Sequence, residues 1–194
     1  MKNSKDNEMK LVLLILKSPE KEYNSRNLAE LMGISPMGAL KIARRLAKEG
    51  ILKAKQIGKS KIYSINHESS YAISYASFLM KRESEWSKAY VKRWIGELQK
   101  IKHANAIILF GSVLKKEKEA EDIDSLIIVN KKAFQTVEKE VDKINILNEK
   151  KIHPVYQTEE DLEKNIKSGN KVILNAIKGI VVSGEEKLVS LLRK

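Results

Sequence analysis

The chain contains no cysteine among its 194 residues. This absence excludes disulfides and metal sites built on thiolate ligands, and nothing in it points to an oxidising compartment. The three histidines, His67, His103 and His153, are scattered along the sequence without the spacing of a metal-binding cluster. We therefore expect each histidine to be a surface or packing residue.

Long apolar runs are also missing. The stretch from Leu11 to Leu16 is apolar and follows basic residues, but it is short for the core of a signal peptide, and no small-residue cleavage site follows it. No run reaches membrane-spanning length, so the sequence predicts a cytoplasmic protein with no membrane partner. A composition that is 42% hydrophobic is enough for real cores, and the length suggests two modest domains.

Positive charge is concentrated at one end of the chain. Residues 1–67 contain 14 Lys and Arg against 6 Asp and Glu, a net charge of +8. Residues 68–104 contain 7 against 4 (net +3), and residues 105–194 contain 16 against 15 (net +1). A general bias toward lysine would raise the net charge of the C-terminal half as well. The pattern therefore favours a polyanionic partner for the N-terminal part.

The first 67 residues predict three helices followed by a hairpin. We expect the helices at Asp6–Lys17, Ser25–Leu31 and Ser35–Glu49. Ser25 and Ser35 suit N-caps, and Pro36 suits the first helical position. The strands are expected at Ile51–Lys55 and Lys61–Ile65, around a tip formed by Gly58-Lys59-Ser60.

The third of these helices has two distinct faces. Its apolar stripe consists of Ala39, Ile42, Ala43 and Leu46, which recur at helical spacing and should face the core. Its outer face carries Met37, Lys41, Arg44, Arg45 and Lys48. A basic helix face beside a lysine-bearing hairpin is typical of nucleic-acid binding, and a simply solvated face is the alternative.

Roughly residues 6–66 resemble the winged helix-turn-helix regulators of bacteria and archaea, most specifically in NLAELMGIS and ARRLAKEGIL. The resemblance implies that the helix Ser35–Glu49 enters the major groove of double-stranded DNA and that the hairpin touches flanking phosphate or the minor groove. The residues it assigns to DNA binding are Ser35, Met37, Lys41, Arg44, Arg45, Lys59 and Lys61. A winged helix that binds only protein is the alternative.

Residues 68–104 predict a helical connector between two domains. Residues 71–101 contain no proline and a single glycine, which favours one or two long helices. Aromatic residues recur along them, at Tyr71, Tyr75, Phe78, Trp86, Tyr90 and Trp94. This stripe can bury either against the second domain or across a dimer. Since winged-helix regulators commonly read two-fold sites as dimers, we expect a homodimer.

The second domain, residues 105–194, begins with two short apolar runs that predict buried strands, Ala106–Phe110 and Ile123–Val129. Gly111 and Ser112 follow the first run, and Asp122 and Asp124 stand at the head of the second. Residues two apart on a strand share a face, so the two carboxylates can hold Mg²⁺ together with substrate phosphates. A solvated strand entrance without metal is the alternative.

This stretch resembles the core of the minimal nucleotidyltransferases in the DNA-polymerase-β-like superfamily. The resemblance implies that Gly111 and Ser112 bind a nucleoside triphosphate and that Asp122 and Asp124 are the catalytic pair that binds Mg²⁺. The sequence departs from the family pattern at Lys116, where a glycine is usual, and at Glu121, where a serine is usual. The family's third carboxylate lies on the next strand, and the corresponding HPVYQ contains neither Asp nor Glu.

The rest of the chain alternates between helices and strands. We expect a helix at Lys131–Lys150, a strand at His153–Gln157, and helices at Thr158–Lys167 (with Thr158 as N-cap), Asn170–Lys178 and Glu185–Leu192. Gly179–Gly184 is expected to be a small edge strand. The predicted fold class is therefore α+β: an N-terminal winged helix-turn-helix, a helical connector, and a nucleotidyltransferase-like mixed sheet flanked by helices.

Three functions are compatible with this reading. The first is a DNA-binding transcriptional regulator whose second domain binds a nucleotide but has lost efficient catalysis. The second is a working Mg²⁺-dependent nucleotidyltransferase that transfers a nucleoside monophosphate to a hydroxyl acceptor. The third is a partner-binding module that uses neither site. The missing third carboxylate favours the first function over the second, and the basic N-terminal domain disfavours the third.

Overall fold

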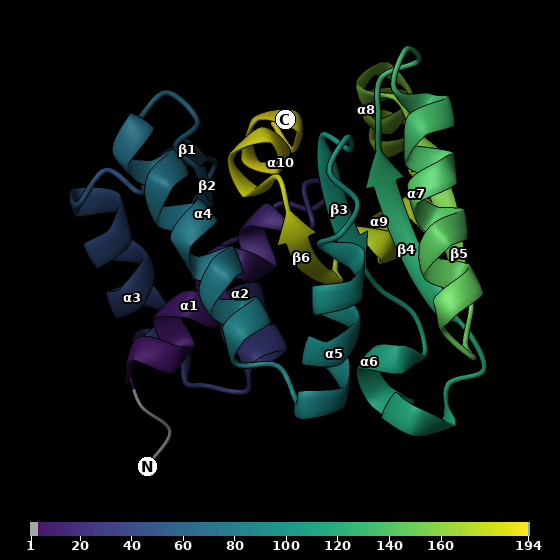
Figure 1. Ribbon diagram of the computed structural model, residues 1–194. Helices are drawn as coiled ribbons and strands as arrows, with labels where there is room; N and C mark the ends of the chain where they lie inside the picture. Colours follow the sequence, from purple (N-terminus) through teal and green to yellow (C-terminus); the bar gives the residue numbers. More distant parts are fainter. Residues whose placement is uncertain (1–3, 194) are drawn as a thin grey trace. The chain divides into compact units, whose positions relative to one another are not determined.

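The computed structural model describes residues 4–193, and over this range the fold is mixed α+β, with ten α-helices and two small sheets (Figure 1). Residues 1–3 and 194, at the outer ends of the two predicted domains, lie outside the described residues. The chain divides into two compact units. Unit 1 extends to Leu79 and includes Leu192 and Arg193, and unit 2 comprises Met80–Leu191. The division thus falls within the predicted connector.

Unit 1 contains three helices, a hairpin and the first part of a fourth helix. These elements are α1 (Ser4–Leu16), α2 (Ser25–Met32), α3 (Pro36–Lys48), β1 (Leu52–Ile57), β2 (Ser60–Ile65) and α4 (Ser70–Glu85). Their order along the chain is the one the sequence predicts. The core contains side chains from each of the first three helices and from β2, with Leu11, Leu28, Leu46 and Tyr63 all at most 2% exposed.

Side-chain caps fix where α2 and α3 begin. Ser35 caps α3 as predicted, since its hydroxyl accepts the N–H of Gly38 at 3.1 Å. The prediction that Ser25 caps α2 is wrong, because Asn24 does so. The Asn24 side chain accepts the N–H of Asn27 at 3.0 Å, and the Asn27 side chain accepts the N–H of Asn24 at 2.9 Å. These two hydrogen bonds satisfy backbone N–H groups that have no partner within α2 itself. A cap at Ser25 would leave the same groups without a partner.

The hairpin of β1 and β2 is antiparallel and turns through Gly58 and Lys59 alone, because Ser60 already pairs with Ile57. Tyr23 extends this sheet by an isolated bridge to Tyr63, whose N–H donates to the Tyr23 carbonyl at 2.7 Å. The segment before α2 is thereby held against β2.

Unit 2 is built on a four-stranded sheet of order β5-β4-β3-β6. Its strands are β3 (Ala106–Leu109), β4 (Ile123–Ile128), β5 (Ile152–Gln157) and β6 (Ile180–Ser183). Its helices after α4 are α5 (Ala89–Leu98), α6 (Val113–Lys116), α7 (Phe134–Leu147), α8 (Glu159–Lys167), α9 (Lys171–Ala176) and α10 (Glu185–Leu191), with a short 3-10 helix, η1 (Glu117–Glu119). The predicted edge strand is confirmed as β6, which pairs only with β3.

Helices cover both faces of this sheet. On one face, Ile107 and Ile127 join a buried cluster with Trp94 of α5 and Val141 of α7. On the other face, α9 contacts β4 and α10 contacts β3. The crossover through α7 makes β4 and β5 parallel, whereas β3 pairs antiparallel with both of its neighbours (Figure 1). No helix in residues 4–193 is both long and apolar enough to cross a membrane.

Candidate functional site

The predicted phosphate-binding turn and the two aspartates meet at one end of β3 and β4. The antiparallel pairing of these strands continues one step past Leu109, where the N–H of Phe110 donates to the Asp124 carbonyl at 3.0 Å. The chain then turns at Gly111, with a φ of +82°, and enters α6 through Ser112. The turn therefore lies directly against the start of β4.

Gly111 is in unusually close contact with Asp124. A Cβ atom built on Gly111 would lie 1.9 Å from Oδ2 of Asp124 and 2.8 Å from its Cγ. Only a glycine leaves room for this carboxylate, and the positive φ also favours glycine. The backbone N–H of Ser112 donates to the same carboxylate. The turn thus places backbone amides and a carboxylate side by side.

His153 joins the site from β5. It stands next to Asp124 in the parallel pairing of β4 with β5, and its Nδ1 lies 3.0 Å from Oδ2 of Asp122. The His153 side chain is 61% exposed, which agrees with the expectation of a surface residue. Its place beside the aspartates is not predictable from sequence alone, because it depends on the register between β4 and β5.

The charge of Asp122 destabilises the ionised form of Asp124. Burial raises the pKa of Asp124, and the negative charge of Asp122 raises it further. The positive charge of His153 and the N–H of Ser112 act in the opposite direction. A cation between the carboxylates would relieve this repulsion. Oxygen-only donors fit Mg²⁺, which keeps waters or phosphates in its other positions.

The donor set is small. Across residues 4–193, no group of three His, Cys, Asp or Glu side chains is arranged to hold a metal ion. The strand β5, where the resembled family has its third carboxylate, reads Ile-His-Pro-Val-Tyr-Gln here. Two carboxylates can hold a cation that also binds a ligand's phosphates, but they form no complete metal cage.

The close contact at Gly111 leads to a first prediction. Gly111→Ala should lower the free energy of unfolding of unit 2 by the left-handed backbone cost of about 1–2 kcal/mol plus about 1–3 kcal/mol for displacing Asp124. Gly169→Ala is the matched control, because Gly169 has a φ of +73° but nothing within 4 Å of its added Cβ. Urea unfolding followed by tryptophan fluorescence reports on unit 2, which contains both tryptophans. Equal losses of unfolding free energy in the two variants would contradict the close contact between Gly111 and Asp124.

A second prediction concerns pH. Because folding raises the pKa of Asp124, the native state binds this proton more tightly than the unfolded chain does, and the ionised group costs stability. That cost is absent below the ordinary aspartate pKa of 3.8, grows as the pH rises to the raised pKa, and is constant above it. Asp124→Asn still accepts the N–H of Ser112, so it should be more stable than wild type at neutral pH and equal to it in acid. The exposed Asp142→Asn should show no such pH-dependent gain, and unfolding curves across the acid range would check both.

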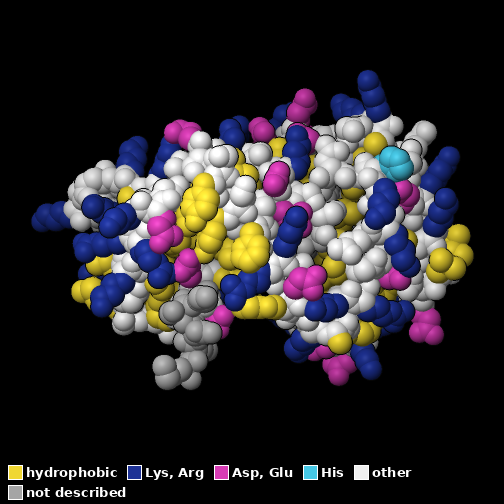
Figure 2. Space-filling model, turned by 60° about the vertical axis from the view of Figure 1, so that its left-hand side comes forward, with side chains coloured by type: hydrophobic (Ala, Val, Ile, Leu, Met, Phe, Trp, Pro, Cys, Tyr) yellow, Lys and Arg dark blue, Asp and Glu magenta, His cyan; other side chains and the backbone are white. Residues whose placement is uncertain are grey.

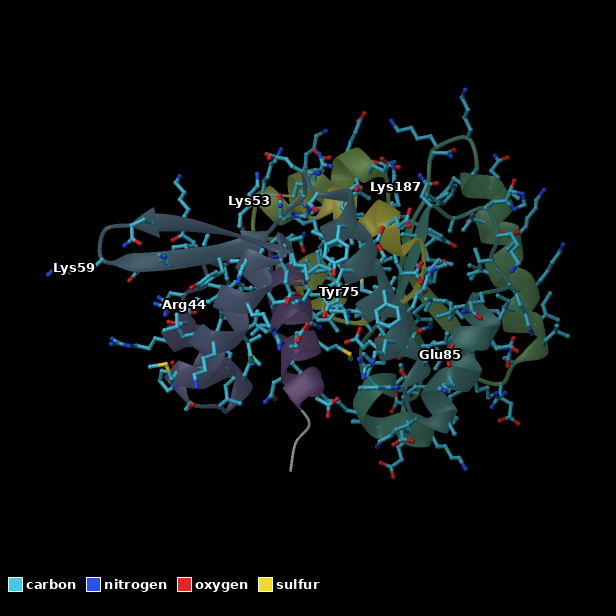
Figure 3. The ribbon with its side chains drawn as sticks, turned by 90° about the vertical axis from the view of Figure 1, so that its left-hand side faces the viewer. Arg44, Lys53, Lys59, Tyr75, Glu85 and Lys187 are labelled. Atoms are coloured by element: carbon cyan, nitrogen blue, oxygen red, sulfur yellow. The ribbon has the colours of Figure 1, made fainter. Side chains whose placement is uncertain are left out.

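The predicted DNA-binding residues lie on the outer side of α3 and on the hairpin. Met37 is 60% exposed, and Lys41 and Arg44 are also exposed on the helix. Figure 3 shows Arg44 on α3 and Lys59 at the outer end of the hairpin. On the face drawn in Figure 2, lysine and arginine side chains stand out from the surface more often than acidic ones. Contact of these residues with DNA stays a prediction.

Two of the predicted residues already have partners inside unit 1. The Ser35 hydroxyl is occupied by its capping bond to Gly38. Arg45 forms an ion pair with Glu8 of α1, and Glu8 also accepts a hydrogen bond from the Tyr75 hydroxyl of α4. Burial and the bond to Glu8 both raise the pKa of Tyr75, so its hydroxyl stays protonated as the donor. Glu8 of α1 therefore links α3 and α4 through Arg45 and Tyr75.

Among known proteins, the chain has a weak structural match. No family model matches the chain, and no curated protein matches it. Among solved structures, the chain is similar to a mutant of Lactococcus lactis ZitR in apo form, with 16% sequence identity and a TM-score of 0.33. The match covers 50% of this chain and 79% of that one.

Proposed function

We propose that the protein is a DNA-binding transcriptional regulator in which unit 1 acts as a winged helix-turn-helix. The observation that carries this proposal is the set of exposed cations on α3 and the hairpin, in the region of the chain that has a net charge of +8. Such a surface neutralises phosphates, and a helix followed by a hairpin can serve the major groove and the flanking backbone. As part of this proposal, we expect the protein to act in the cytoplasm.

Arg44 and Arg45 take different roles in this proposal. Arg44 is exposed and forms no ion pair within the described chain, so its guanidinium is free to reach a guanine edge. Arg45 is held by Glu8 and lies 3.8 Å from Glu49. We assign base reading to Arg44 and assign to Arg45 the positioning of α3 against α1.

Unit 2 is proposed to bind a nucleoside triphosphate with Mg²⁺, as a nucleotidyltransferase-like domain with weakened catalysis. The convergence of the Gly111-Ser112 turn on Asp124 supports this role, because the turn offers backbone amides to phosphates beside a carboxylate. Asp122 and Asp124 would hold the Mg²⁺, whose charge offsets that of the phosphates when it is bound. The absence of a carboxylate on β5 supports binding without efficient transfer, since the site lacks a third carboxylate to hold the metal.

An active nucleotidyltransferase is the alternative function, favoured by the same convergence of the two aspartates on the turn. In that reaction an acceptor hydroxyl would attack the α-phosphorus in line, a new phosphate ester would form, and pyrophosphate would leave while the hydroxyl proton passes to solvent.

A homodimer is part of the proposal. Tyr71 and Phe78 of α4 are each 56% exposed, and the ring of Tyr75 lies beside that of Tyr71, with centroids 6.3 Å apart. Exposed aromatic side chains one and two turns apart on a helix form an apolar face that a second copy of the same helix can cover. This face also suits the two-fold sites that paired recognition helices read.

The DNA proposal predicts binding that weakens steeply with salt, because each neutralised phosphate releases counterions. Lys59→Ala should reduce the slope of log affinity against log salt by about one and lower affinity alike for all duplexes. Arg44→Ala should instead cost about 1–3 kcal/mol at a preferred duplex and relax its sequence preference. Selection from a random duplex library, followed by titrations at several salt concentrations, would supply these values and the number of chains bound per duplex.

Lys143→Ala is the control for this experiment, because Lys143 is an exposed lysine of α7 in unit 2. It should leave both the affinity and the salt slope unchanged. Equal affinity of wild type and a variant lacking Arg44, Lys59 and Lys61 for every duplex would defeat the assignment of α3 and the hairpin. One chain bound to each two-fold duplex would defeat the dimer.

The nucleotide proposal predicts a synergy in thermal stability. A nucleoside triphosphate with Mg²⁺ should raise the melting temperature of unit 2 well above the effect of either alone, because the pair binds only the native site. The double variant Asp122→Asn with Asp124→Asn should lose this synergy, whereas Asp142→Asn should keep it. A label-transfer assay on the same samples separates the two functions. Binding without transfer supports a sensor, transfer that the double variant loses supports the enzyme, and no binding of any nucleotide contradicts both.

A further inference from the structure

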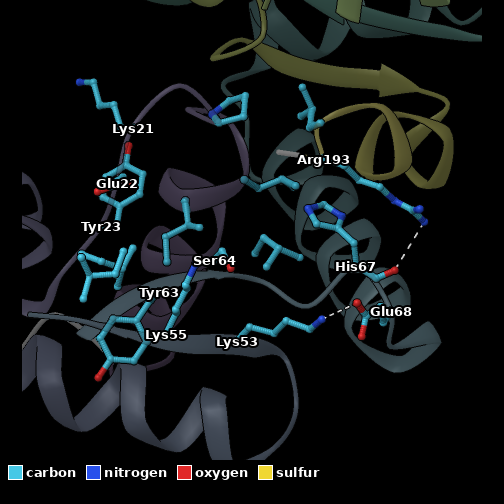
Figure 4. A pocket seen from close by; sticks show the side chains of 17 residues that line it. Lys21, Glu22, Tyr23, Lys53, Lys55, Tyr63, Ser64, His67, Glu68 and Arg193 are labelled. Carbon is cyan, nitrogen blue, oxygen red and sulfur yellow. Dashed lines mark hydrogen bonds and ion pairs between the residues drawn. The ribbon is translucent and has the colours of Figure 1, made fainter. Parts of the chain in front are cut away.

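Unit 1 contains a hollow of about 480 Å³ that the proposed DNA contacts do not use (Figure 4). Its walls come from three separate stretches of the chain: the end of α1 with the segment that leads to Tyr23, the hairpin, and residues Leu192 and Arg193. This volume lies within the range of small-molecule sites, which span about 300–1,000 Å³.

The inner part of the hollow is apolar. Ile15 and Leu16 at the end of α1 are 6% and 1% exposed, and Leu192 is 2% exposed. Ile62 of β2 completes this surface. A ligand with an apolar body would therefore bury hydrocarbon against hydrocarbon here, which a sugar-phosphate backbone would not do.

The rim of the hollow is cationic. Lys21, Lys53, Lys55 and Arg193 line it, against two acidic residues, Glu22 and Glu68. Lys53 bonds Glu68 at 2.6 Å, and this contact lowers the pKa of Glu68, so that the pair stays ionised and mutually neutralised (Figure 4). Lys55 forms no ion pair with any carboxylate in residues 4–193.

The register of the hairpin decides which lysines face the hollow. Lys53 pairs with Ser64 and Lys55 with Ile62, so these four side chains share one face of the hairpin. Lys61 pairs with Gln56 and therefore points to the opposite face. Lys55 thus stands beside the apolar side chain of Ile62, with a positive charge that no neighbouring carboxylate satisfies.

We propose that this hollow binds a small amphipathic anion, with its apolar body against Leu16, Ile62 and Leu192 and its carboxylate on Lys55. Charge complementarity selects an anion over a neutral or cationic amphiphile of the same shape. The site is distinct from the α3 surface, and its occupancy is measured without DNA. If the hollow binds no anion, the DNA proposal therefore still stands. If the protein binds no DNA, the proposal for the hollow still stands.

The test uses decanoate as the probe, below its micelle concentration, with the full-length protein. Isothermal titration should show saturable binding of decanoate, with much weaker binding of decanol and of decyltrimethylammonium. Lys55→Gln should weaken decanoate binding about fivefold, the scale of one solvent-accessible ion pair. Lys61→Gln is the matched control on the opposite face of the same hairpin, and it should leave the affinity unchanged. Both lysines are exposed, so neither change should lower the melting temperature.

Each of the following binding results would overturn the proposal. Equal binding of the three amphiphiles would show adsorption to any apolar surface. Equal losses in the two lysine variants would show a general response to net charge, and decanoate binding that is unaffected by Lys55→Gln would place the ligand elsewhere. An absence of decanoate binding up to its micelle concentration would reject an amphipathic anion as the ligand. Amide chemical shifts of Ile62 and Ile65 that move with decanoate, while those of β3 do not, would support the hollow as the site.

Discussion

The contact between Gly111 and the Asp124 carboxylate sets the arrangement of the candidate site in unit 2. It exists because β3 and β4 pair in one register, which places the turn after Leu109 beside the first residues of β4. The strands are fixed by burial, since Ile107, Ile127 and their neighbours are removed from water on both faces of the sheet. That apolar burial offsets the cost of holding a partly desolvated carboxylate against a backbone turn. The site is therefore a polar feature whose geometry is maintained by an apolar sheet.

Local sequence signals predicted most of the elements, because each signal acts within a few residues. The apolar runs at Ala106–Phe110 and Ile123–Val129 became β3 and β4, and Ser35-Pro36 opened α3. The capping error at Ser25 is also local. Asparagine and serine are both strong N-caps, and only the reciprocal bonds of Asn24 with Asn27 decide between the two neighbours. N-cap propensity alone therefore could not decide whether α2 is capped by Asn24 or by Ser25.

The features that sequence could not predict depend on contacts between distant residues. His153 lies beside the aspartates only because β5 pairs with β4 in a particular parallel register. The helical pattern puts Arg45 among several equivalent surface cations, yet Glu8, 37 residues earlier, binds it. The burial of the two tryptophans also differs in a way that depends on such contacts. Trp94 lies on the buried stripe of α5 with Val91 and Leu98, whereas Trp86 is 55% exposed beneath the guanidinium of Arg82, 3.9 Å from its ring centroid.

For the nucleotide site proposed in unit 2, the imidazole on β5 favours binding over transfer. A carboxylate at that position would add a negative charge to the pair and strengthen its hold on a cation. His153 instead lies against Oδ2 of Asp122 at 3.0 Å, where an N–H from the ring occupies one of the oxygens that a cation would use. The other oxygens of Asp122 and Asp124 remain for a cation that the ligand's phosphates share. The proposed site would depend on its ligand to complete the coordination of the metal, which would suit reversible recognition of a nucleotide more than the fixed geometry that in-line transfer requires.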